Sequence, residues 1–295
     1  MHEFDHGRIL VGKLLRGEEV EVRFVNPVAA VCLAAIRDNC SRLKLVGRAQ
    51  GYARASGLEA AIATGEPQPK PNELLGVNYS PLTRLRLPLD VESCNTTINA
   101  LFRNRLAEHG EALVGRICKV VGELHDNVTS HSRGSGFSAA QVYRRRLVFG
   151  IADSGCGILR AIRRAAPHIV EHGAAISWAF QKGNTGAVVS DSMAQRWEPG
   201  ASDPYTDYGE ELGNHHQGLG LWTLEQLVSD FGGALWLWSG DAVRRRDDRG
   251  WVELDPGTTW SGVVIALEIP LNPATDQAVG SYISDDEGLA EDLGL

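Results

Sequence analysis

Residues 111–130 most constrain the fold, because their apolar side chains recur at the spacing of one face of an α-helix. A helix with such a stripe is stabilised mainly by packing the stripe against another part of the protein. The stripe consists of Leu113, Ile117, Val120, Val121, Leu124 and Val128. We therefore expect a helix that packs on a core and leaves its polar residues at the edge of that core.

One flank of this predicted helix is polar. Glu123, Asn127 and Ser130 stand at positions i, i+4 and i+7, and His131 follows them. Two interpretations are open for this flank. It is either a run of solvated polar residues or a site where a carboxylate and an amide act together on a metal-bound phosphate. The helix alone does not decide between them.

The first 85 residues have the pattern of a small α/β unit. Residues 19–24 alternate polar and apolar side chains, which predicts a strand. Asn26 and Pro27 then supply a helix cap and a first helical residue for an apolar helix. The elements expected after that helix are a strand at 43–46, a helix at 52–63 and a proline-rich loop at 66–72.

Residues 86–272 predict a second unit, and residues 273–295 an acidic tail without lysine or arginine that is loosely attached. Residues 182–217 are rich in Gly, Ser, Asp and Asn, and a loop of this length is usually functional or disordered. The elements expected around it are strands at 84–90, 146–152, 234–239 and 262–269 and helices at 96–109, 111–130, 158–167 and 219–231.

A second polar feature, the stretch IADSGCGI, follows the strand at 146–152. Asp153 ends the strand, and Gly155 and Gly157 follow it. An aspartate in this place can accept a hydrogen bond from a ligand amine, and glycines allow the backbone to approach a ligand closely. Ordinary turns often have the same pattern, so a purely structural turn remains the alternative.

A third feature is the pair Gly218 and Gly220, at the beginning of the amphipathic helix expected at 219–231. Free backbone N–H groups at a helix N-terminus form a ready site for an anion. The chain contains neither a P-loop motif nor the glycine fingerprint of dinucleotide-binding folds.

In their order and spacing, these three features resemble the GHKL superfamily of ATP-binding domains. That superfamily includes the ATPase domains of DNA gyrase and histidine kinases and the anti-sigma-factor serine kinases. The likeness covers roughly residues 86–270. It implies an α+β fold, a two-layer α/β sandwich of the Bergerat type, in which ATP lies between the helical layer and the sheet under a mobile lid.

The resemblance implies roles for single residues. Asn127 corresponds to the family's Mg²⁺-binding asparagine, whose amide oxygen is a hard ligand that suits this ion. Glu123 corresponds to the acid that activates a water or hydroxyl nucleophile. His131 corresponds to a polar or basic position near the phosphates. Asp153 corresponds to the aspartate that accepts a hydrogen bond from the adenine amine.

The glycines also have counterparts in the family. Gly155 and Gly157 would let the backbone pack on the base and ribose of the nucleotide. Gly218, Leu219 and Gly220 correspond to the turn on the phosphate side. These residues would therefore bind the cofactor through backbone rather than side-chain groups.

The lid region resembles the family less closely. Thr185, preceded by Gly183 and Asn184, resembles a lid-side motif near the phosphates. After Gly262 the chain has Val263, where the family often has a threonine that supports the adenine aspartate. The support of Asp153 is therefore the point at which this sequence departs from the family.

The layout of residues 1–85 resembles the STAS-type anti-anti-sigma domains. Histidine kinases instead place a helical hairpin with a phosphoacceptor histidine before the ATP-binding domain, and no such hairpin is predicted here. STAS domains carry a phosphorylatable serine after the second strand, and Asn26 and Pro27 stand near its place.

The amino-acid composition limits which partners the protein is expected to bind and where in the cell it is expected to be. The net charge of -8 argues against a general binder of nucleic acid or of a membrane surface. No apolar run is long enough for a membrane span, and the N-terminus has no signal-like region. The 5 cysteines form no CxxC pair, which indicates reduced thiols of a cytoplasmic protein. We expect a protein partner, and a homodimer stays open.

Three functions follow from the resemblance. The first is a signalling protein that binds Mg-ATP, hydrolyses it and acts as a nucleotide-dependent switch on a partner protein. The second is a serine/threonine protein kinase of the anti-sigma-factor type. The third is a nucleotide-sensing binding module without turnover. Glu123 favours the first two, because a binding module needs no general base.

Overall fold

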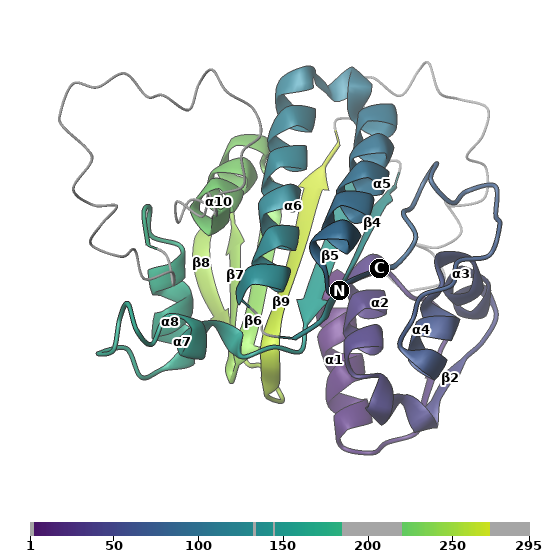
Figure 1. Ribbon diagram of the computed structural model, residues 1–295, viewed down its shortest axis with the longest axis horizontal. Coiled ribbons are helices and arrows are strands. Elements are labelled where there is room, and N and C mark those ends of the chain that lie inside the picture. Colours follow the sequence, from purple (N-terminus) through teal and green to yellow (C-terminus); the bar gives the residue numbers. More distant parts are fainter. Residues whose placement is uncertain (1–2, 132–133, 144, 185–219, 272–295) are drawn as a thin grey trace.

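The computed structural model describes residues 3–131, 134–143, 145–184 and 220–271 (Figure 1). These residues form a mixed α+β structure around one seven-stranded sheet in which all neighbouring strands are antiparallel. Across the sheet the strands are β3 (Thr83–Leu85), β4 (Gly136–Val142), β5 (Arg146–Asp153), β9 (Trp260–Pro270), β6 (Ala234–Gly240), β7 (Ala242–Asp247) and β8 (Gly250–Leu254).

Helices cover the sheet, and a separate parallel pair of short strands, β1 (Val20–Val22) and β2 (Leu43–Leu45), lies in the N-terminal part. The α-helices are α1 (Glu3–Leu15), α2 (Pro27–Ala35), α3 (Arg48–Ser56), α4 (Leu58–Thr64), α5 (Pro88–Leu106), α6 (Glu111–His131), α7 (Gly157–Ala161), α8 (His172–Ala179) and α10 (Gly220–Phe231). The 3₁₀-helices are η1 (Arg37–Arg42) and η2 (Ala107–His109).

Strand β5 is buried on both faces of the sheet. Successive side chains of a strand point to opposite faces. Leu147 and Phe149 belong to one hydrophobic cluster, whereas Val148 and Ala152 belong to another. Strands β6 and β9 divide their side chains in the same way. The centre of the sheet is therefore covered by apolar contacts on each side.

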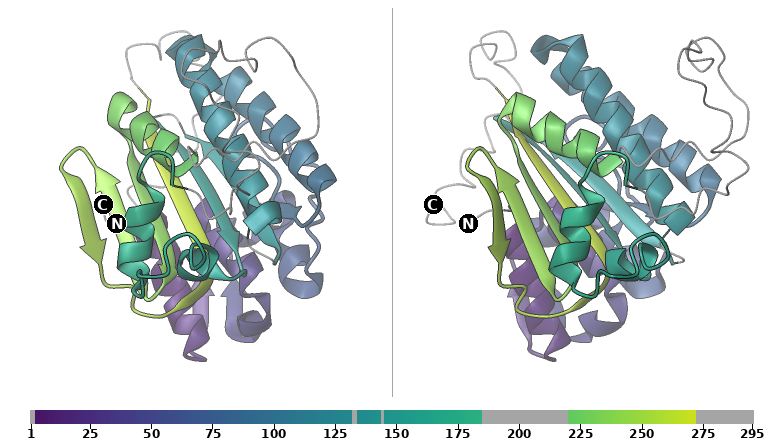
Figure 2. Two further views of the ribbon diagram at one scale, coloured as in Figure 1. Left: turned by 60° about the vertical axis from the view of Figure 1, so that its left-hand side comes forward. Right: turned by 90° about the vertical axis from the view of Figure 1, so that its left-hand side faces the viewer.

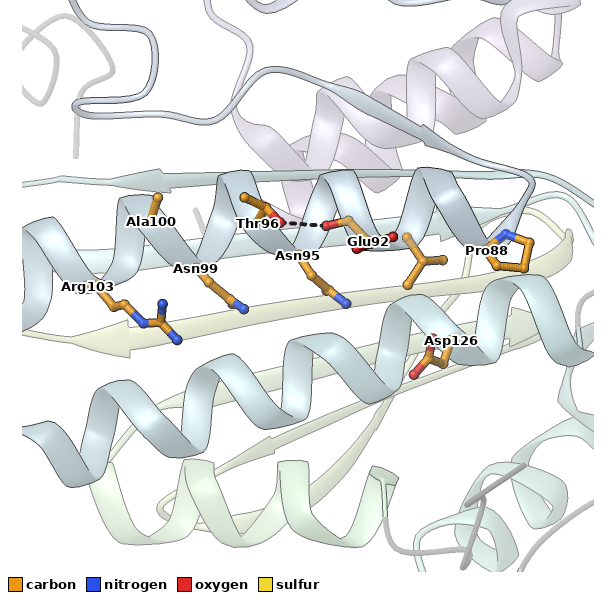
Figure 3. Close-up of a pocket in the computed structure, with 9 residues that line it drawn as sticks. Pro88, Glu92, Asn95, Thr96, Asn99, Ala100, Arg103 and Asp126 are labelled. Atoms are coloured by element: carbon orange, nitrogen blue, oxygen red, sulfur yellow. Dashed lines mark hydrogen bonds between the residues drawn. The ribbon is translucent and has the colours of Figure 1, made fainter. Parts of the chain in front are cut away.

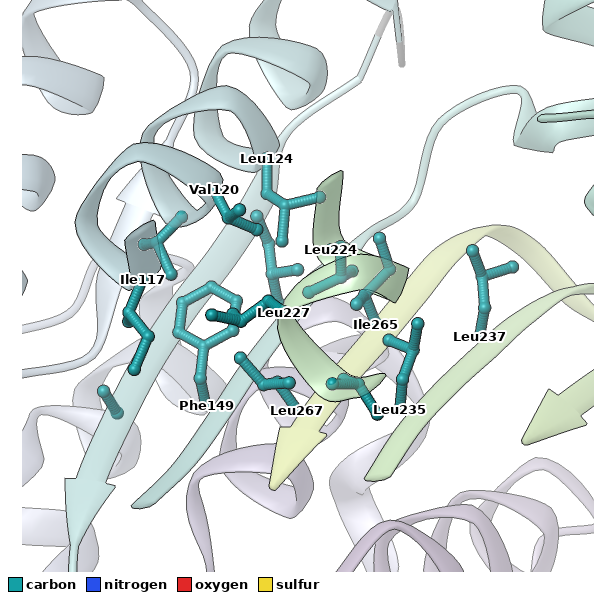
Figure 4. Close-up of a cluster of buried hydrophobic side chains, with 14 of the residues drawn as sticks. Ile117, Val120, Leu124, Phe149, Leu224, Leu227, Leu235, Leu237, Ile265 and Leu267 are labelled. Carbon is teal, nitrogen blue, oxygen red and sulfur yellow. The ribbon is translucent and has the colours of Figure 1, made fainter. Parts of the chain in front are cut away.

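Helices α5, α6 and α10 cover one face of the sheet (Figure 2). Leu124 of α6 and Leu224 of α10 pack with Phe149 of β5 in one cluster, which Figure 4 shows. An ion pair of 2.6 Å between Arg116 and Asp230 also joins α6 to α10. The predicted apolar stripe of residues 111–130 is buried in this layer, as expected.

Helices α1 and α2 cover the opposite face (Figure 2). Phe4 of α1 stacks on Trp236 of β6 with ring centroids 5.9 Å apart. A Cβ on Gly150 of β5 would lie only 2.9 Å from the Cα of Val28, so α2 runs directly over this glycine. The residues of α2 from Pro27 to Ala34 are all buried.

The sequence predicted a sandwich of two layers, one of helices and one of strands. The structure has a third layer, because helices α1 and α2 cover the other face of the sheet. The sequence predicted that residues 1–85 form a unit of their own. In the structure, their helices α1 and α2 share a hydrophobic cluster with strands of residues 86–272. The physical reason is that the central strands are apolar on both faces, and the second face needs a cover.

Most predicted elements are present, with some changes in their bounds. The helix at 111–130 is α6, the strand at 146–152 is β5, and Asn26 caps α2 by accepting the N–H of Ala29 at 2.7 Å. The single helix expected at 52–63 is wrong, because Gly57 at φ 90 separates α3 from α4. The strand expected at 84–90 is also shorter, since α5 begins at Pro88.

Candidate functional site

Helix α6 presents the first two candidate residues. Glu123 and Asn127 lie one turn apart on it, and both are half-buried. At 100° per residue their side chains leave the helix on one flank. His131 is the last residue of α6, and its side chain lies outside the described part of the chain. The structure therefore places the carboxylate and the amide together, as the sequence predicted.

Asp153 ends β5 and is 5% exposed. Its Oδ1 accepts the backbone N–H of Gly155 at 2.7 Å. Burial raises the pKa of this carboxyl to about 6, although hydrogen bonds from the N–H groups of Gly155 and Val263 oppose the shift. A buried carboxyl with a raised pKa is common at functional sites, and here it lies beside a glycine-rich turn.

The turn after Asp153 is held in one conformation. Gly157 has a φ of 71, which favours glycine, and the N–H of Ile158 next to it donates to Ser239 Oγ at 3.0 Å. Ser239 in turn donates to the carbonyl of Gly262 at 2.9 Å. Gly262 packs so closely on Asp153 that a Cβ would overlap it.

Val263 is the position where the sequence departs from the GHKL pattern. Its backbone N–H donates to the Asp153 carboxyl. The carboxyl group is therefore supported by backbone N–H groups where a threonine hydroxyl was the expectation. Sequence reasoning could not find this support, since a backbone N–H is present at any residue except proline.

The residues just before β4 lie against the Asp153 turn. A Cβ on Gly134 would lie 3.1 Å from the Cα of Gly155, and the N–H of Ser154 donates to the carbonyl of Ser135 at 3.2 Å. A Cβ on Gly136 would lie 2.8 Å from Val128 Cγ1 of α6 and 3.2 Å from Asp153 Cβ, so the C-terminal part of α6 and the strand end with Asp153 belong to one region of the molecule.

The described part of helix α10 starts at Gly220, and the anion site expected at the N-terminus of this helix stays a prediction. Gly218, Leu219 and Thr185 lie outside the described residues. Lys182, shortly before this segment, lies 4.9 Å from the centre of the Trp222 ring in the first turns of α10. The described ends of the segment at 185–219 are therefore close to each other.

Gly183 and Asn184 are the described part of the lid-side motif. Gly183 has a φ of 84, and Asn184 donates through Nδ2 to the carbonyl of Trp178 at 2.9 Å. This hydrogen bond holds Asn184 against the last turn of α8. Its contact with phosphate stays a prediction.

Sequence reasoning missed His125, a fully buried histidine of α6. Its Nδ1 lies 2.6 Å from Asn95 Oδ1 on α5, and its Nε2 lies 2.7 Å from Ser138 Oγ on β4. Burial lowers the pKa of His125 to about 3, so the ring is neutral. The signal was available, because position 125 follows Val121 by four and precedes Val128 by three, within the apolar face.

All 5 cysteines are free thiols, and three of them are buried. Cys94 Sγ lies 3.7 Å from His125 Nε2, but burial raises the pKa of Cys94 to about 12. Cys94 is therefore a thiol at neutral pH and a poor nucleophile. Burial likewise raises the pKa of Cys32 to about 12.

Asn127 and Glu123 fit a hard cation such as Mg²⁺, because their side chains carry oxygen donors on one half-buried helix flank. Within the described ranges, no three His, Cys, Asp or Glu side chains converge on one point. A cation here would thus take few protein ligands and complete its shell with phosphate oxygens and water, which is how Mg²⁺ is usually held.

A groove of about 540 Å³ runs between α5 and α6 on the outer side of the helical layer (Figure 3). Asn95, Asn99 and Arg103 of α5 and Asp126 of α6 are among its lining residues, whereas Glu123 and Asn127 are not. The groove is therefore distinct from the flank that carries the candidate site. In the part of the chain that is described, no helix is long and apolar enough to cross a membrane.

Comparison of the chain with models of known protein families finds no match. Comparison with curated proteins likewise finds none.

Proposed function

We propose that the chain binds Mg-ATP at the site formed by α6, the Asp153 turn and the start of α10. It hydrolyses the nucleotide and acts as a nucleotide-dependent switch on a partner protein. The GHKL likeness of residues 86–270 supports this proposal, and so does the α+β architecture with its antiparallel sheet and helices.

The buried carboxyl of Asp153 is the observation that carries the proposal. Asp153 is 5% exposed, and among the described residues its carboxyl accepts hydrogen bonds from the backbone N–H groups of Gly155 and Val263, which carry no full positive charge. Burying such a group is costly, so a fold retains it for a reason. Accepting a hydrogen bond from an adenine amine is a role that suits a carboxyl at the end of a strand.

The residues of α6 would act at the other end of the nucleotide. Asn127 would hold Mg²⁺ through its amide oxygen, and the bound ion would neutralise charge on the phosphates. Glu123, one turn earlier, would accept a proton from the water that attacks the terminal phosphate. The N–H groups at the start of α10 would face the phosphates, as helix N-termini do.

The proposed role of Glu123 separates an enzyme that turns ATP over from a protein that only binds it. A kinase of the anti-sigma-factor type would use the same residue to activate a serine or threonine hydroxyl on a partner, and a pure sensor would not need it. A test with labelled ATP and candidate partner proteins separates hydrolysis from transfer, since only transfer labels a protein.

The first experiment is isothermal titration of the full chain with ATP, ADP and GTP, with and without Mg²⁺. We expect selective binding of adenine nucleotides and a loss of roughly tenfold or more in affinity for Asp153→Asn, because the carboxylate has two acceptor oxygens whereas the amide has one acceptor oxygen and a donor NH2 group. Glu123→Gln should retain ATP binding and lose at least about 100-fold in turnover, the range for loss of a general base.

Matched variants control for folding. Asp255 accepts the N–H of Gly257 at 2.9 Å in a similar but exposed turn, so Asp255→Asn should leave ATP binding unchanged. Asp126→Asn is the control on α6, because Asp126 lines the outer groove. A folded wild-type chain that binds no adenine nucleotide would show the proposal to be wrong.

A further inference from the structure

His125 joins three elements by directional hydrogen bonds. Asn95 Oδ1 can only accept, so the proton of the neutral imidazole is on Nδ1, 2.6 Å away. Nε2 then accepts the hydroxyl proton of Ser138 at 2.7 Å. Both ring nitrogens are satisfied inside the core, and α6 is bonded to α5 on one side and to β4 on the other.

These bonds constrain α6 in a way that its apolar contacts do not. Apolar packing is non-directional, whereas hydrogen bonds weaken steeply with angle. The rotation of α6 about its axis and its height over the sheet are therefore fixed at His125. Glu123 and Asn127 flank this position, two residues before it and two after it, and leave the helix on a different side.

The same strand that binds His125 also touches Asp153. Gly136 of β4 pairs with Asp153 of β5, and Ser138 follows two residues later. A Cβ on Gly136 would lie 2.8 Å from Val128 Cγ1 and 3.2 Å from Asp153 Cβ. Strand β4 thus fixes the position of α6 relative to Asp153 at two points, His125 and Val128.

We propose that His125 is a positioning residue that, through Asn95 and Ser138, sets Glu123 and Asn127 at their working distance from Asp153. This inference rests on the proposed function and deepens it. A helix rotation of about 10° moves a side-chain end by about 1 Å, and a misplacement of that size can lower a catalysed rate about 100-fold.

The geometry also says what His125 does not control. The adenine end of the proposed site is formed by β5, β9 and the Asp153 turn, and these elements are separate from α6 in the chain. A small shift of α6 therefore affects the phosphates and Mg²⁺ more than the base. This difference separates a positioning role from a general loss of stability.

The test compares His125→Leu with His125→Gln in the full chain. For His125→Leu we expect kcat for Mg-ATP to fall at least about tenfold, while the affinity for ADP without Mg²⁺ stays within about twofold of wild type. His125→Gln should recover part of kcat, because its amide offers both a donor and an acceptor. If the wild type binds ATP without turnover, the enhancement of ATP affinity by Mg²⁺ replaces kcat as the measured quantity.

Ile98→Val is the control for packing, because Ile98 of α5 is fully buried in the same layer. It should lower the unfolding midpoint without lowering kcat. Should His125→Leu fail to fold, Ser138→Ala removes the hydroxyl that is bonded to His125 Nε2 and should likewise lower kcat while leaving the affinity for ADP without Mg²⁺ within about twofold of wild type.

Three outcomes would overturn this inference. A folded His125→Leu with wild-type kcat and Mg²⁺ response would show that the histidine is only structural. An equal loss of affinity for ADP without Mg²⁺ would show that the whole site has loosened. Absence of ATP binding in the wild type would instead remove the proposed function, and this inference with it.

Discussion

At the scale of a single residue, Asp153 is a buried carboxyl beside a glycine-rich turn. Its pKa rises from 3.8 to about 6 because the carboxyl is removed from water, and two backbone N–H donors offset only part of that cost. The carboxyl is mostly ionised at neutral pH, and it gains a proton under mildly acidic conditions in which an exposed aspartate stays charged.

The affinity for ATP should therefore depend on pH. Below a pH of about 6 the protonated Asp153 has lost an acceptor, so ATP binding should weaken, approaching about tenfold for each further pH unit. Above that pH the carboxylate is fully formed and the affinity should level off. Titrations with ATP between about pH 5 and 8 measure this dependence directly.

Asp153→Asn should bind ATP weakly, because it lacks the carboxylate. Its affinity should also stay constant across that pH range, because the amide has no proton to gain. Asp255→Asn, in the exposed turn, should keep the full pH dependence of the wild type. A wild-type affinity that is constant across the range would argue against contact between Asp153 and the nucleotide.

Single residues also show what the sequence can and cannot predict about the site. Glu123 and Asn127 were identifiable, since their spacing alone puts them on one flank of a helix. His125 was within reach of the same argument but was overlooked among the polar residues around it. The backbone support of Asp153 by Val263 could not be predicted, because it depends on how β9 approaches β5.

Elements with strong periodicity were predicted best. Helix α6 and strand β5 agree with the sequence to within a residue, because a long apolar stripe or a compact apolar run defines each of them. Strand β4 has small residues and was not predicted. Strand β7 was not predicted either, and its three consecutive arginines form ion pairs with Glu253, Asp247 and Glu225.

At Gly150 helix α2 approaches strand β5 closely across the second face of the sheet. Its added Cβ would lie 2.9 Å from Val28 Cα and 3.1 Å from Val28 N, which are backbone atoms and cannot rotate away. Gly150→Ala should thus displace α2 from β5 and lower the free energy of unfolding by about 1–3 kcal/mol. Denaturant unfolding monitored by tryptophan fluorescence measures this loss.

Gly115→Ala is the matched control on α6, since no atom lies within 4 Å of its added Cβ. Alanine favours helix over glycine by roughly 1 kcal/mol, so this variant should be neutral or more stable. If Gly150→Ala were as stable as the wild type, α2 could not lie against β5 as it does here.

At the scale of the whole molecule, the seven-stranded sheet of the described residues has a cover of helices on each face. The sequence suggested two units, because a proline-rich loop at 66–72 separates regions of different pattern. That pattern does not say whether two units pack together. In the structure the two regions do pack together, because the second apolar face of strands β5, β6 and β9 is buried against α1 and α2.

The N-terminal layer should therefore be required for the stability of the rest. Removing residues 1–85 deletes this layer together with the short edge strand β3, and the face containing Trp236, Trp238 and Phe137 would be exposed to water. Each such side chain contributes roughly 1.5–3 kcal/mol when buried, and a contiguous exposed face of this kind promotes aggregation. We expect residues 86–272 alone to be aggregated or only partly folded, and the full chain to unfold in one calorimetric transition.

A second truncation distinguishes this dependence from the general effect of shortening the chain. Removing residues 273–295 deletes the predicted acidic tail and leaves both covers of the sheet, so the unfolding midpoint should change little. Mixing separately expressed residues 1–85 with residues 86–272 should restore some folded protein, because the lost contacts lie between these two parts. If residues 86–272 folded alone, bound ATP and melted at the temperature of the full chain, α1 and α2 would be an accessory layer. The apolar second face of the sheet would then need another explanation.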